Sequence, residues 1–393
     1  MHIPLRWIAI GVFLFSSALN YLDRQMFAAL APSIGQEFHL TNEQYGLFIS
    51  AFSIIYALSS PVVGLFIDRA GLDRGITACV GVWSLATMVT GWSSGFGGLM
   101  VSRAMLGCAQ AGGVPASGKA YATYLPPEER SLGTALGQMG ISLGLILAPI
   151  LAAWITPHYG WRTAFIAAGA AGFLWIPIWL FTARHIPKFP VSPTAVKVKV
   201  AGMLRDTQYW GLTIGTCLGM TLYSFWTHWT TKYLVQVFHL TQEAANQQFA
   251  WIPPLCGIAG GLSCGAITLR LAGRGMPVQS ARMVISIIAS VMALVTALVP
   301  MAPSAGIAAA AIGASFFFTT WFSVSSYSMP LDVFGAERAA FAIASITSAY
   351  GLMQFFISPL IGRVVDQHGF APVCVALAFL PLLGTAVLKL TVK

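Results

Sequence analysis

The chain has 393 residues, of which 57% are apolar or aromatic and only 8% are Asp, Glu, Lys or Arg. Soluble domains carry about a quarter charged residues, so this composition excludes a soluble enzyme, a disulfide scaffold and a disordered chain. The net charge of +9 would suggest a nucleic-acid partner for a soluble protein. In a membrane protein it indicates Lys and Arg in cytoplasmic loops instead, so we expect a lipid bilayer and no nucleic acid around this chain.

Twelve stretches are apolar over about the 20 residues that a spanning helix needs. In the first half they cover residues 6–31, 44–66, 75–94, 96–123, 131–154 and 161–183. In the second half they cover residues 208–237, 246–269, 281–301, 303–330, 336–361 and 369–391. The first stretch lacks a small-residue cleavage site and is too long for a signal peptide, so we expect it to be retained. The pattern predicts an all-α membrane protein with twelve transmembrane helices.

Residues 184–205 carry five cations and three prolines and lie between the two sets of six. We interpret them as a basic cytoplasmic linker between an N-terminal six-helix half, 1–183, and a C-terminal six-helix half, 206–393. With both termini in the cytoplasm, 16 of the 21 Lys and Arg fall on that side: Arg6, Arg69, Arg74, Lys119, Arg130, Arg184, Lys188, Lys197, Lys199, Arg205, Arg270, Arg274, Arg282, Arg338, Lys389 and Lys393. This asymmetry predicts that both termini are cytoplasmic.

The two halves also repeat each other at nearly constant offsets. The matched positions, with their offsets, are Glu129 and Glu337 (208), Arg130 and Arg338 (208), Pro149 and Pro359 (210), and Gly64 and Gly265 (201). The repeat indicates a duplicated six-helix unit, with a ligand site expected at the midplane between the repeats. Chance recurrence in an apolar sequence is the alternative.

Charged side chains inside spanning helices are costly and call for an explanation. Asp23 and Arg24 are adjacent in the first helix, so they point about 100° apart. Asn20 shares a face with Asp23, and Tyr21 shares the next face with Arg24. We expect Asp23 to pair with Arg103 of the fourth helix, which leaves Arg24 free to bind a carboxylate through two parallel hydrogen bonds. The alternative is that Arg24 only neutralises another helix and binds no substrate.

Several short sequence motifs occur along the chain. Residues 64–71 read G-L-F-I-D-R-A-G, and residues 20–25 read N-Y-L-D-R-Q. In the fourth helix Gln110 follows Arg103 by seven residues, hence on the same face, and Lys119 near the helix end is expected to extend its amine toward the interface. Pro127–Ser131, Gly160–Arg162 and the W-T-T-K-Y-L of residues 229–234 complete the set.

Residues 64–71 resemble the G-x-x-x-D-R-x-G signature of the major facilitator superfamily. The motifs of the first and fourth helices resemble those of its anion:cation symporter family, and residues 229–234 are similar to the W-x-P-K-Y-L of the hexuronate branch, with Thr231 in place of proline. The resemblance covers nearly the whole chain. It implies a bacterial inner-membrane transporter, monomeric and not an enzyme, which imports a small carboxylate such as a hexuronate or aldonate by proton symport with alternating access.

The resemblance, together with the aromatic side chains of the second half, suggests roles for individual residues. The expected substrate-binding residues are Arg24, Tyr21, Tyr56, Gln110, Gln138, Tyr223, Trp226, Trp321 and Ser348. The expected proton-coupling residues are Asp23 and Arg103, and the expected gating residues are Asp68, Arg69, Glu129 and Arg130. No metal site and no cofactor besides the coupling proton are expected. The aromatic residues of helix seven can equally be packing residues or an interfacial belt.

Two departures from the family pattern keep alternatives open. The family's glutamate of helix four is replaced by Gln110 here, and glutamine does not titrate. Asp23 would then couple alone, or the protein would be a uniporter or an exchanger of another monocarboxylate. The charged loop signature that follows the second helix is also incomplete. Leu72 and Asp73 stand where basic residues are usual, and Leu269 stands where the second-half copy would have an acid. A drug-efflux antiporter shares the fold, but Arg24 has the wrong charge for a cation site.

Overall fold

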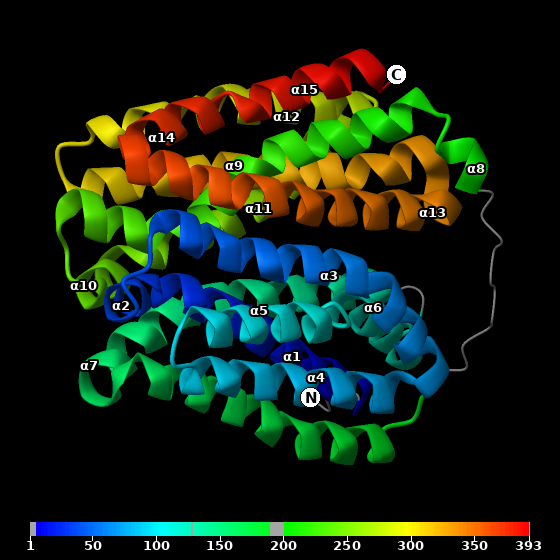
Figure 1. Ribbon diagram of the computed structural model, residues 1–393. Coiled ribbons are helices and arrows are strands. Elements are labelled where there is room, and N and C mark those ends of the chain that lie inside the picture. Colours follow the sequence, from blue (N-terminus) through cyan, green and yellow to red (C-terminus); the bar gives the residue numbers. More distant parts are fainter. Residues whose placement is uncertain (1–4, 127–128, 189–199, 393) are drawn as a thin grey trace. The chain divides into compact units, whose positions relative to one another are not determined.

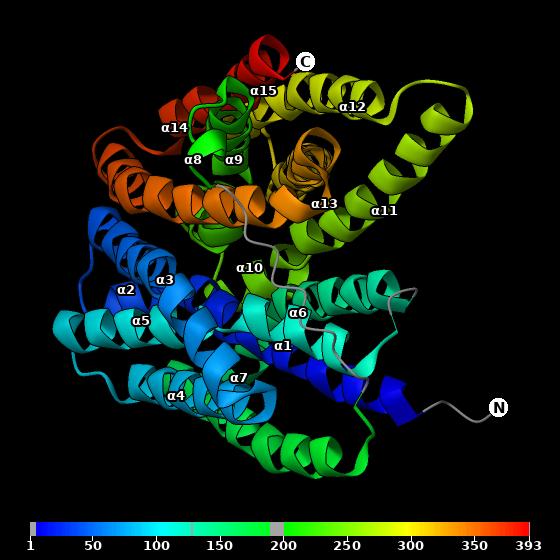
Figure 2. The same cartoon turned by 90° about the vertical axis from the view of Figure 1, so that its right-hand side faces the viewer.

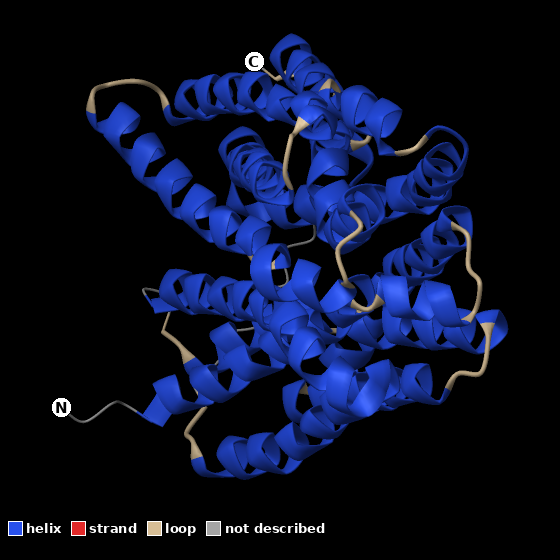
Figure 3. Ribbon diagram, turned by 90° about the vertical axis from the view of Figure 1, so that its left-hand side faces the viewer, coloured by secondary structure: helices blue, strands red, loops and turns tan. Residues whose placement is uncertain are grey.

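The computed structural model describes residues 5–126, 129–188 and 200–392, and these residues form helices and connecting loops with no strand (Figures 1 and 3). Lys197, Lys199 and Lys393 of the predicted cytoplasmic set lie outside the described residues, as do the side chains of Glu337 and Arg338. The first helices are α1 (Leu5–Ala29), α2 (Ala31–Glu37), α3 (Asn42–Ala70), α4 (Leu72–Trp92), α5 (Phe96–Gln110), α6 (Gly113–Tyr124) and α7 (Arg130–His185). The later ones are α8 (Val200–Met203), α9 (Thr207–Phe238), α10 (Gln242–Ala245), η2 (Asn246–Ala250), α11 (Ile252–Gly273), α12 (Val278–Met292), η3 (Ala293–Met301), α13 (Ala305–His368), α14 (Phe370–Ala378) and α15 (Leu380–Thr391).

The twelve predicted spans can all be traced in these helices. Nine helices of the described residues are long and apolar enough to cross a membrane by length and composition. The count is lower than twelve because α7 contains two spans, which meet at the non-helical Gly160 (φ 78°). The remaining two are α9, which is less apolar, and the fourth span, which is divided into α5 and α6. The prediction of an all-α membrane protein with twelve spans is confirmed.

The chain divides into two compact units. Unit 1 comprises Met1–Pro193 together with Thr241–Trp251, and unit 2 comprises Thr194–Leu240 together with Ile252–Lys393. The division after Pro193 falls inside the predicted linker. The inclusion of Thr241–Trp251 in unit 1 was not expected from the sequence. Asn246 Nδ2 donates to Ala29 O at 2.8 Å, and Gln242 Oε1 accepts from Ser33 N at 2.9 Å, so this segment is hydrogen-bonded to the end of α1 and to α2.

Within unit 1, α1 packs along α7, and α5 lies between α3 and α4 (Figure 2). The approach of α1 to α7 is close because α7 presents Gly140 and Gly144. A Cβ atom on Gly144 would lie 2.3 Å from Ala18 O. Small residues four apart allow such backbone contact between spanning helices. The close contact fixes the helix that carries Tyr21 and Arg24.

Within unit 2, α9 packs on α13 and α15. Here too the approach depends on glycine, since a Cβ on Gly215 of α9 would lie 2.8 Å from Gly384 O of α15. In each unit a glycine thus allows the first spanning helix, α1 or α9, to pack closely against a partner helix.

The backbone supports the internal repeat. Three pairs of residues with positive φ occur at equivalent positions of the two halves: His39 and His239, Gly71 and Gly275, and Gly160 and Gly369. Non-glycine residues rarely adopt positive φ, so the histidine pair is the most specific of the three. It lies within an F-H-L-T sequence that occurs at 38–41 and again at 238–241, a repeat that was not among those predicted from the sequence.

Candidate functional site

Arg24 lies at the centre of a group of neutral side chains in unit 1. Its Nε and Nη2 donate to Oε1 of Gln110 at 3.3 and 3.2 Å. Its guanidinium carbon lies 4.7 Å from the ring centroid of Tyr21 and 5.2 Å from that of Tyr56. Arg24 forms no ion pair with another described residue. Within the described part of the chain, the cation is therefore held by amide oxygens and aromatic faces, and no carboxylate neutralises its charge.

Gln110 connects Arg24 to the backbone of α1. Its Oε1 accepts from Arg24, while its Nε2 donates to the carbonyl oxygen of Asn20 at 3.0 Å. The side chain is 1% exposed. An amide can make both contacts at once because it carries a donor and an acceptor. Gln110 thus orients the guanidinium without removing its charge.

A small cavity adjoins this group. Its volume is about 40 Å³, which has room for a few water molecules or for one small ligand group. The cavity is lined by Ser16, Ser17, Asn20, Tyr21, Arg24, Tyr56, Trp83, Gln110, Gly113, Val114, Ser117 and Ile141. Four predicted substrate residues, Arg24, Tyr21, Tyr56 and Gln110, are therefore brought together at one cavity.

The expected ion pair between Asp23 and Arg103 is not among the ion pairs of the described residues. Arg103 Nη2 donates to Thr90 Oγ1 at 2.7 Å, and the guanidinium packs 4.5 Å from the ring centroid of Phe27. Asp23 is 1% exposed, and its Oδ1 has no hydrogen-bond partner among the described residues. The two charges are buried in the same unit, but a hydroxyl and an aromatic face occupy the places that the carboxylate was expected to take.

Asn20 makes a contact that was not predicted. The sequence predicted that it shares the face of Asp23, and in the structure its Oδ1 accepts from Arg24 Nη2 at 3.5 Å. Residues three and four apart on a helix are both neighbours, so Asn20 reaches Arg24 without leaving the face that it was predicted to share with Asp23.

The other predicted substrate residues are not among the residues that line this cavity. Gln138 is exposed on α7. In unit 2, Trp226 is 1% exposed and its Nε1 donates to Thr296 at 3.5 Å, which is a packing environment. Trp321 Nε1 donates to Ser263 Oγ at 2.9 Å. Tyr223 packs against Phe316, and Ser348 is half-buried on α13. Substrate contacts for these five residues stay predictions.

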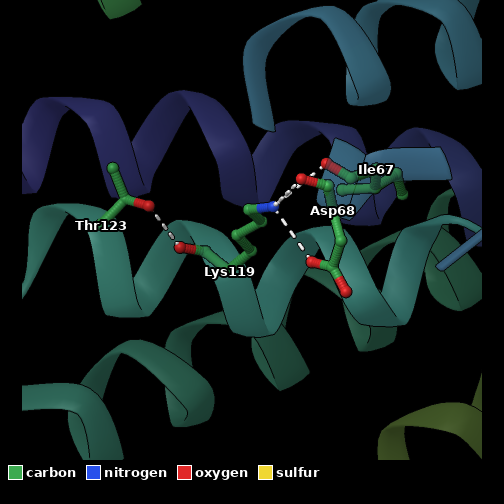
Figure 4. Close-up of polar contacts among 4 residues, drawn as sticks. All are labelled: Ile67, Asp68, Lys119 and Thr123. Carbon is green, nitrogen blue, oxygen red and sulfur yellow. Dashed lines mark hydrogen bonds and ion pairs between the residues drawn. The ribbon is translucent and has the colours of Figure 1, made fainter. Parts of the chain in front are cut away.

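The predicted gating residues form contacts at the end of unit 1 where α1 begins. Lys119 Nζ donates to Asp68 Oδ1 and to Ile67 O, both at 3.0 Å, so it closes the last turn of α3 (Figure 4). Lys119 was expected to reach toward the interface, and this contact was not predicted. Glu129 accepts two hydrogen bonds from Arg6.

Two gating residues take part in none of the ion pairs that the described residues form. Arg130 donates to Leu125 O at 3.3 Å and to Ala122 O at 3.4 Å, at the end of α6. Arg69 is exposed.

At the opposite end of unit 1, Glu37 joins α2 to α7. Trp161 Nε1 donates to Glu37 Oε2 at 2.6 Å, and Arg162 pairs with the same carboxylate. The hydrogen bond from Trp161, together with that from Arg162 and its charge, holds the pKa of Glu37 below its usual value. This contact gives the Gly160–Arg162 motif a structural role.

Comparison with known proteins places the chain in a family. The Major Facilitator Superfamily sequence model matches residues 13–358, so the chain belongs to this superfamily. It is 27% identical to the hexuronate transporter of Escherichia coli (strain K12), over 98% of this chain and 93% of that protein. It is 29% identical to the galacturonate transporter of Dickeya chrysanthemi, over 64% of this chain and 78% of that protein.

The fold has solved counterparts. The structure of a bacterial homologue of the human lysosomal transporter Spinster matches with a TM-score of 0.80 and 17% identity, over 100% of this chain and 97% of that chain. This likeness shows the fold alone. Family and fold together make the chain an integral, multi-pass membrane transporter and not an enzyme.

Proposed function

We propose that the protein imports a sugar acid, a hexuronate or an aldonate, by proton symport with alternating access. The observation that carries the proposal is Arg24, which lines a cavity inside spanning helices and has no carboxylate partner in the described part of the chain. A guanidinium presents a planar fork of N–H donors that matches a carboxylate. The carboxylate of the substrate would supply the negative charge that Arg24 lacks in the described part of the protein.

The surroundings of Arg24 suit the rest of such a substrate. Tyr21 and Tyr56 offer aromatic faces with polar ends, and such groups contact both the C–H surface and the hydroxyls of a sugar. The printed names of the two transporters described above, for hexuronate and galacturonate, support the same substrate class. A drug-efflux antiporter is disfavoured, because the positive charge of Arg24 would repel a cationic drug.

The coupling proton is assigned to Asp23. It is an acidic side chain buried in the interior of unit 1, and its Oδ1 accepts no hydrogen bond from the described residues. Protonation would give that oxygen a hydrogen and remove a buried charge. Arg103 would favour the ionised form through its charge. We further propose an inner-membrane location, cytoplasmic termini and a monomeric state, for which the Lys and Arg distribution and the superfamily are the support.

The test is uptake of labelled D-glucuronate into proteoliposomes, with and without an inward proton gradient. Arg24→Ala removes the anion site, and Arg24→Lys keeps the charge but loses the fork. We expect Arg24→Ala to lower uptake by about 100-fold or more, since a buried charged contact is lost, and Arg24→Lys to be impaired as well. Arg205→Ala, at an exposed arginine before α9, is the matched control and should behave as wild type.

The outcomes separate the open alternatives. Accumulation that requires the gradient supports symport. Uptake that ignores the gradient would identify a uniporter or exchanger. Wild-type-like uptake by Arg24→Ala would overturn the proposed anion site.

A further inference from the structure

Asn20 lines the cavity and carries a donor that no group in the described part of the protein accepts. The residue is 5% exposed, and its Nδ2 has no hydrogen-bond partner there. Buried polar atoms in proteins are almost always paired, so an unpaired donor at a cavity calls for an explanation. Asn20 lies one helical turn before Arg24, on the same α1 helix, and both residues line the cavity.

The orientation of this amide is fixed by its neighbours. Its Oδ1 accepts from Arg24 Nη2 at 3.5 Å. The reverse orientation would point two N–H donors at a cation, so the oxygen must face Arg24 and the nitrogen must face away. Gln110 Nε2 holds the backbone oxygen of Asn20 at 3.0 Å. The side-chain oxygen and the backbone oxygen of Asn20 are therefore both hydrogen-bonded, and Nδ2 is held in place as a donor.

Gly113 keeps the space beside Nδ2 open. A Cβ atom at this glycine would lie 3.3 Å from Asn20 Nδ2, and Gly113 itself lines the cavity. Because position 113 carries no side chain, no Cβ atom stands between the donor and this wall of the cavity.

We propose that Asn20 is a specificity-determining residue, whose Nδ2 donates to the oxygen on the carbon next to the substrate carboxylate. This proposal rests on the proposed function. With the carboxylate on Arg24, the closest further acceptor of a sugar acid is the oxygen on its α carbon. That atom is a hydroxyl in aldonates and the ring oxygen in cyclic hexuronates, and an amide N–H can donate to either.

The selectivity follows from the cost of leaving the donor unpaired. A site built to hydrogen-bond a substrate oxygen discriminates strongly against an analogue that lacks it, because the buried protein group then loses its partner. The protein should accordingly prefer 2-hydroxy acids over the matching 2-deoxy acids.

The experiment measures inhibition of labelled D-gluconate uptake by unlabelled D-gluconate and by unlabelled 2-deoxy-D-gluconate. The full-length protein in proteoliposomes is used. We expect wild type to prefer D-gluconate by about tenfold or more. Asn20→Leu keeps the side-chain size and removes the donor, and it should bring the ratio of the two inhibition constants close to one. Asn42→Leu makes the same change at an asparagine away from the cavity and should keep the wild-type ratio.

The outcomes distinguish this inference from the proposed function. Failure of the wild-type protein to take up any sugar acid would overturn the proposed function. Equal inhibition by both acids in wild type would leave the function standing and overturn the role of Asn20. A preference retained by Asn20→Leu would overturn it as well. Should Asn20→Leu fail to assemble, Asn20→Ala replaces it, since it also removes the donor and should likewise bring the ratio of the two inhibition constants close to one.

Discussion

At the scale of single residues, the neutrality of position 110 governs the charge of the cavity. Gln110 accepts from Arg24 and donates to the backbone of Asn20. An ionised carboxylate there could only accept, and it would neutralise Arg24. Tyr21 of the same helix and Tyr56 of α3 face Arg24, and no Asp or Glu is among the residues that line the cavity. Arg24 is therefore the charged side chain of the cavity lining.

Gln110→Glu should make substrate uptake newly sensitive to pH. When the introduced carboxyl group is protonated, it can still donate to the Asn20 carbonyl, and Arg24 stays available. As the pH rises, the side chain ionises, pairs with Arg24 and competes with the anionic substrate. Uptake by the variant relative to wild type should fall with increasing pH, measured in proteoliposomes between about pH 5 and about pH 8.

Gln110→Met provides the control for this prediction. It removes both hydrogen bonds but adds no titratable group, so its uptake should be reduced by a factor that does not change with pH. A constant ratio of Gln110→Glu to wild type across the pH range would show that position 110 does not control the charge at Arg24.

The sequence predicted individual site residues unevenly, for physical reasons. Arg24, Tyr21, Tyr56 and Gln110 were found because charge and family motif select them, and they meet at one cavity. The direct Asp23–Arg103 ion pair was not found among the described residues. Thr90 and Phe27 contact the guanidinium instead, while its Nε has no hydrogen-bond partner in the described part of the chain. Sequence spacing does not reveal such neutral partners.

At the scale of elements, the end of α3 depends on a lysine from α6. Lys119 Nζ donates to the backbone oxygens of Ile67 and Asp68 as well as to the Asp68 carboxylate. The last carbonyls of a helix lack partners within the helix, so the backbone contacts matter more than the ion pair, whose acid is largely exposed.

We therefore expect unequal effects of removing the two partners. Lys119→Met should lower the free energy of unfolding by about 1 kcal/mol, because it removes the bonds to backbone carbonyls. Asp68→Asn keeps those bonds and an acceptor oxygen, so it should cost less than about 0.5 kcal/mol. Thermal unfolding of the purified protein in detergent measures both. A larger loss for Asp68→Asn would mean that the ion pair, and not the helix end, is what Lys119 serves.

The contact between α1 and α7 permits a second prediction at this scale. A methyl group at Gly144 would lie 2.3 Å from Ala18 O, so Gly144→Ala must push the two helices apart. Overpacking of this kind costs about 1–3 kcal/mol. It should also shift α1, and substrate affinity should weaken together with thermal stability.

Gly118→Ala is the matched control, since a Cβ there meets nothing within 4 Å. It should leave stability unchanged or slightly higher, because alanine favours helix more than glycine does. Equal effects of the two substitutions would argue against close packing as the reason for Gly144.

Element types were more predictable than element ends. Apolar length identified all twelve spans, since the bilayer imposes it. The division of the fourth span after Gln110, and the grouping of Thr241–Trp251 with unit 1, were not predicted. The second depends on hydrogen bonds such as that from Asn246 to Ala29. Such contacts join residues that are distant in the chain and leave no periodic trace in the sequence.

At the scale of the whole molecule, the duplication is expressed in the backbone. Gly71 and Gly275 have φ values of 84° and 89° and follow the second spanning helix of each half, α3 and α11 respectively. A Cβ at either glycine would meet nothing within 4 Å. The requirement for glycine is therefore conformational, and it applies equally in both halves.

Gly71→Ala and Gly275→Ala should accordingly destabilise the protein by similar amounts, about 1–2 kcal/mol each, because alanine is strained at positive φ. Gly265→Ala lies in α11 with equally open space but helical backbone, so it should be neutral or mildly stabilising. Thermal unfolding of the three variants in detergent provides the comparison. A loss in only one of the two loops would show that the halves, although both place a glycine at positive φ there, no longer depend on it equally. Matched losses would show that both copies of the duplicated unit still need a glycine at this connection.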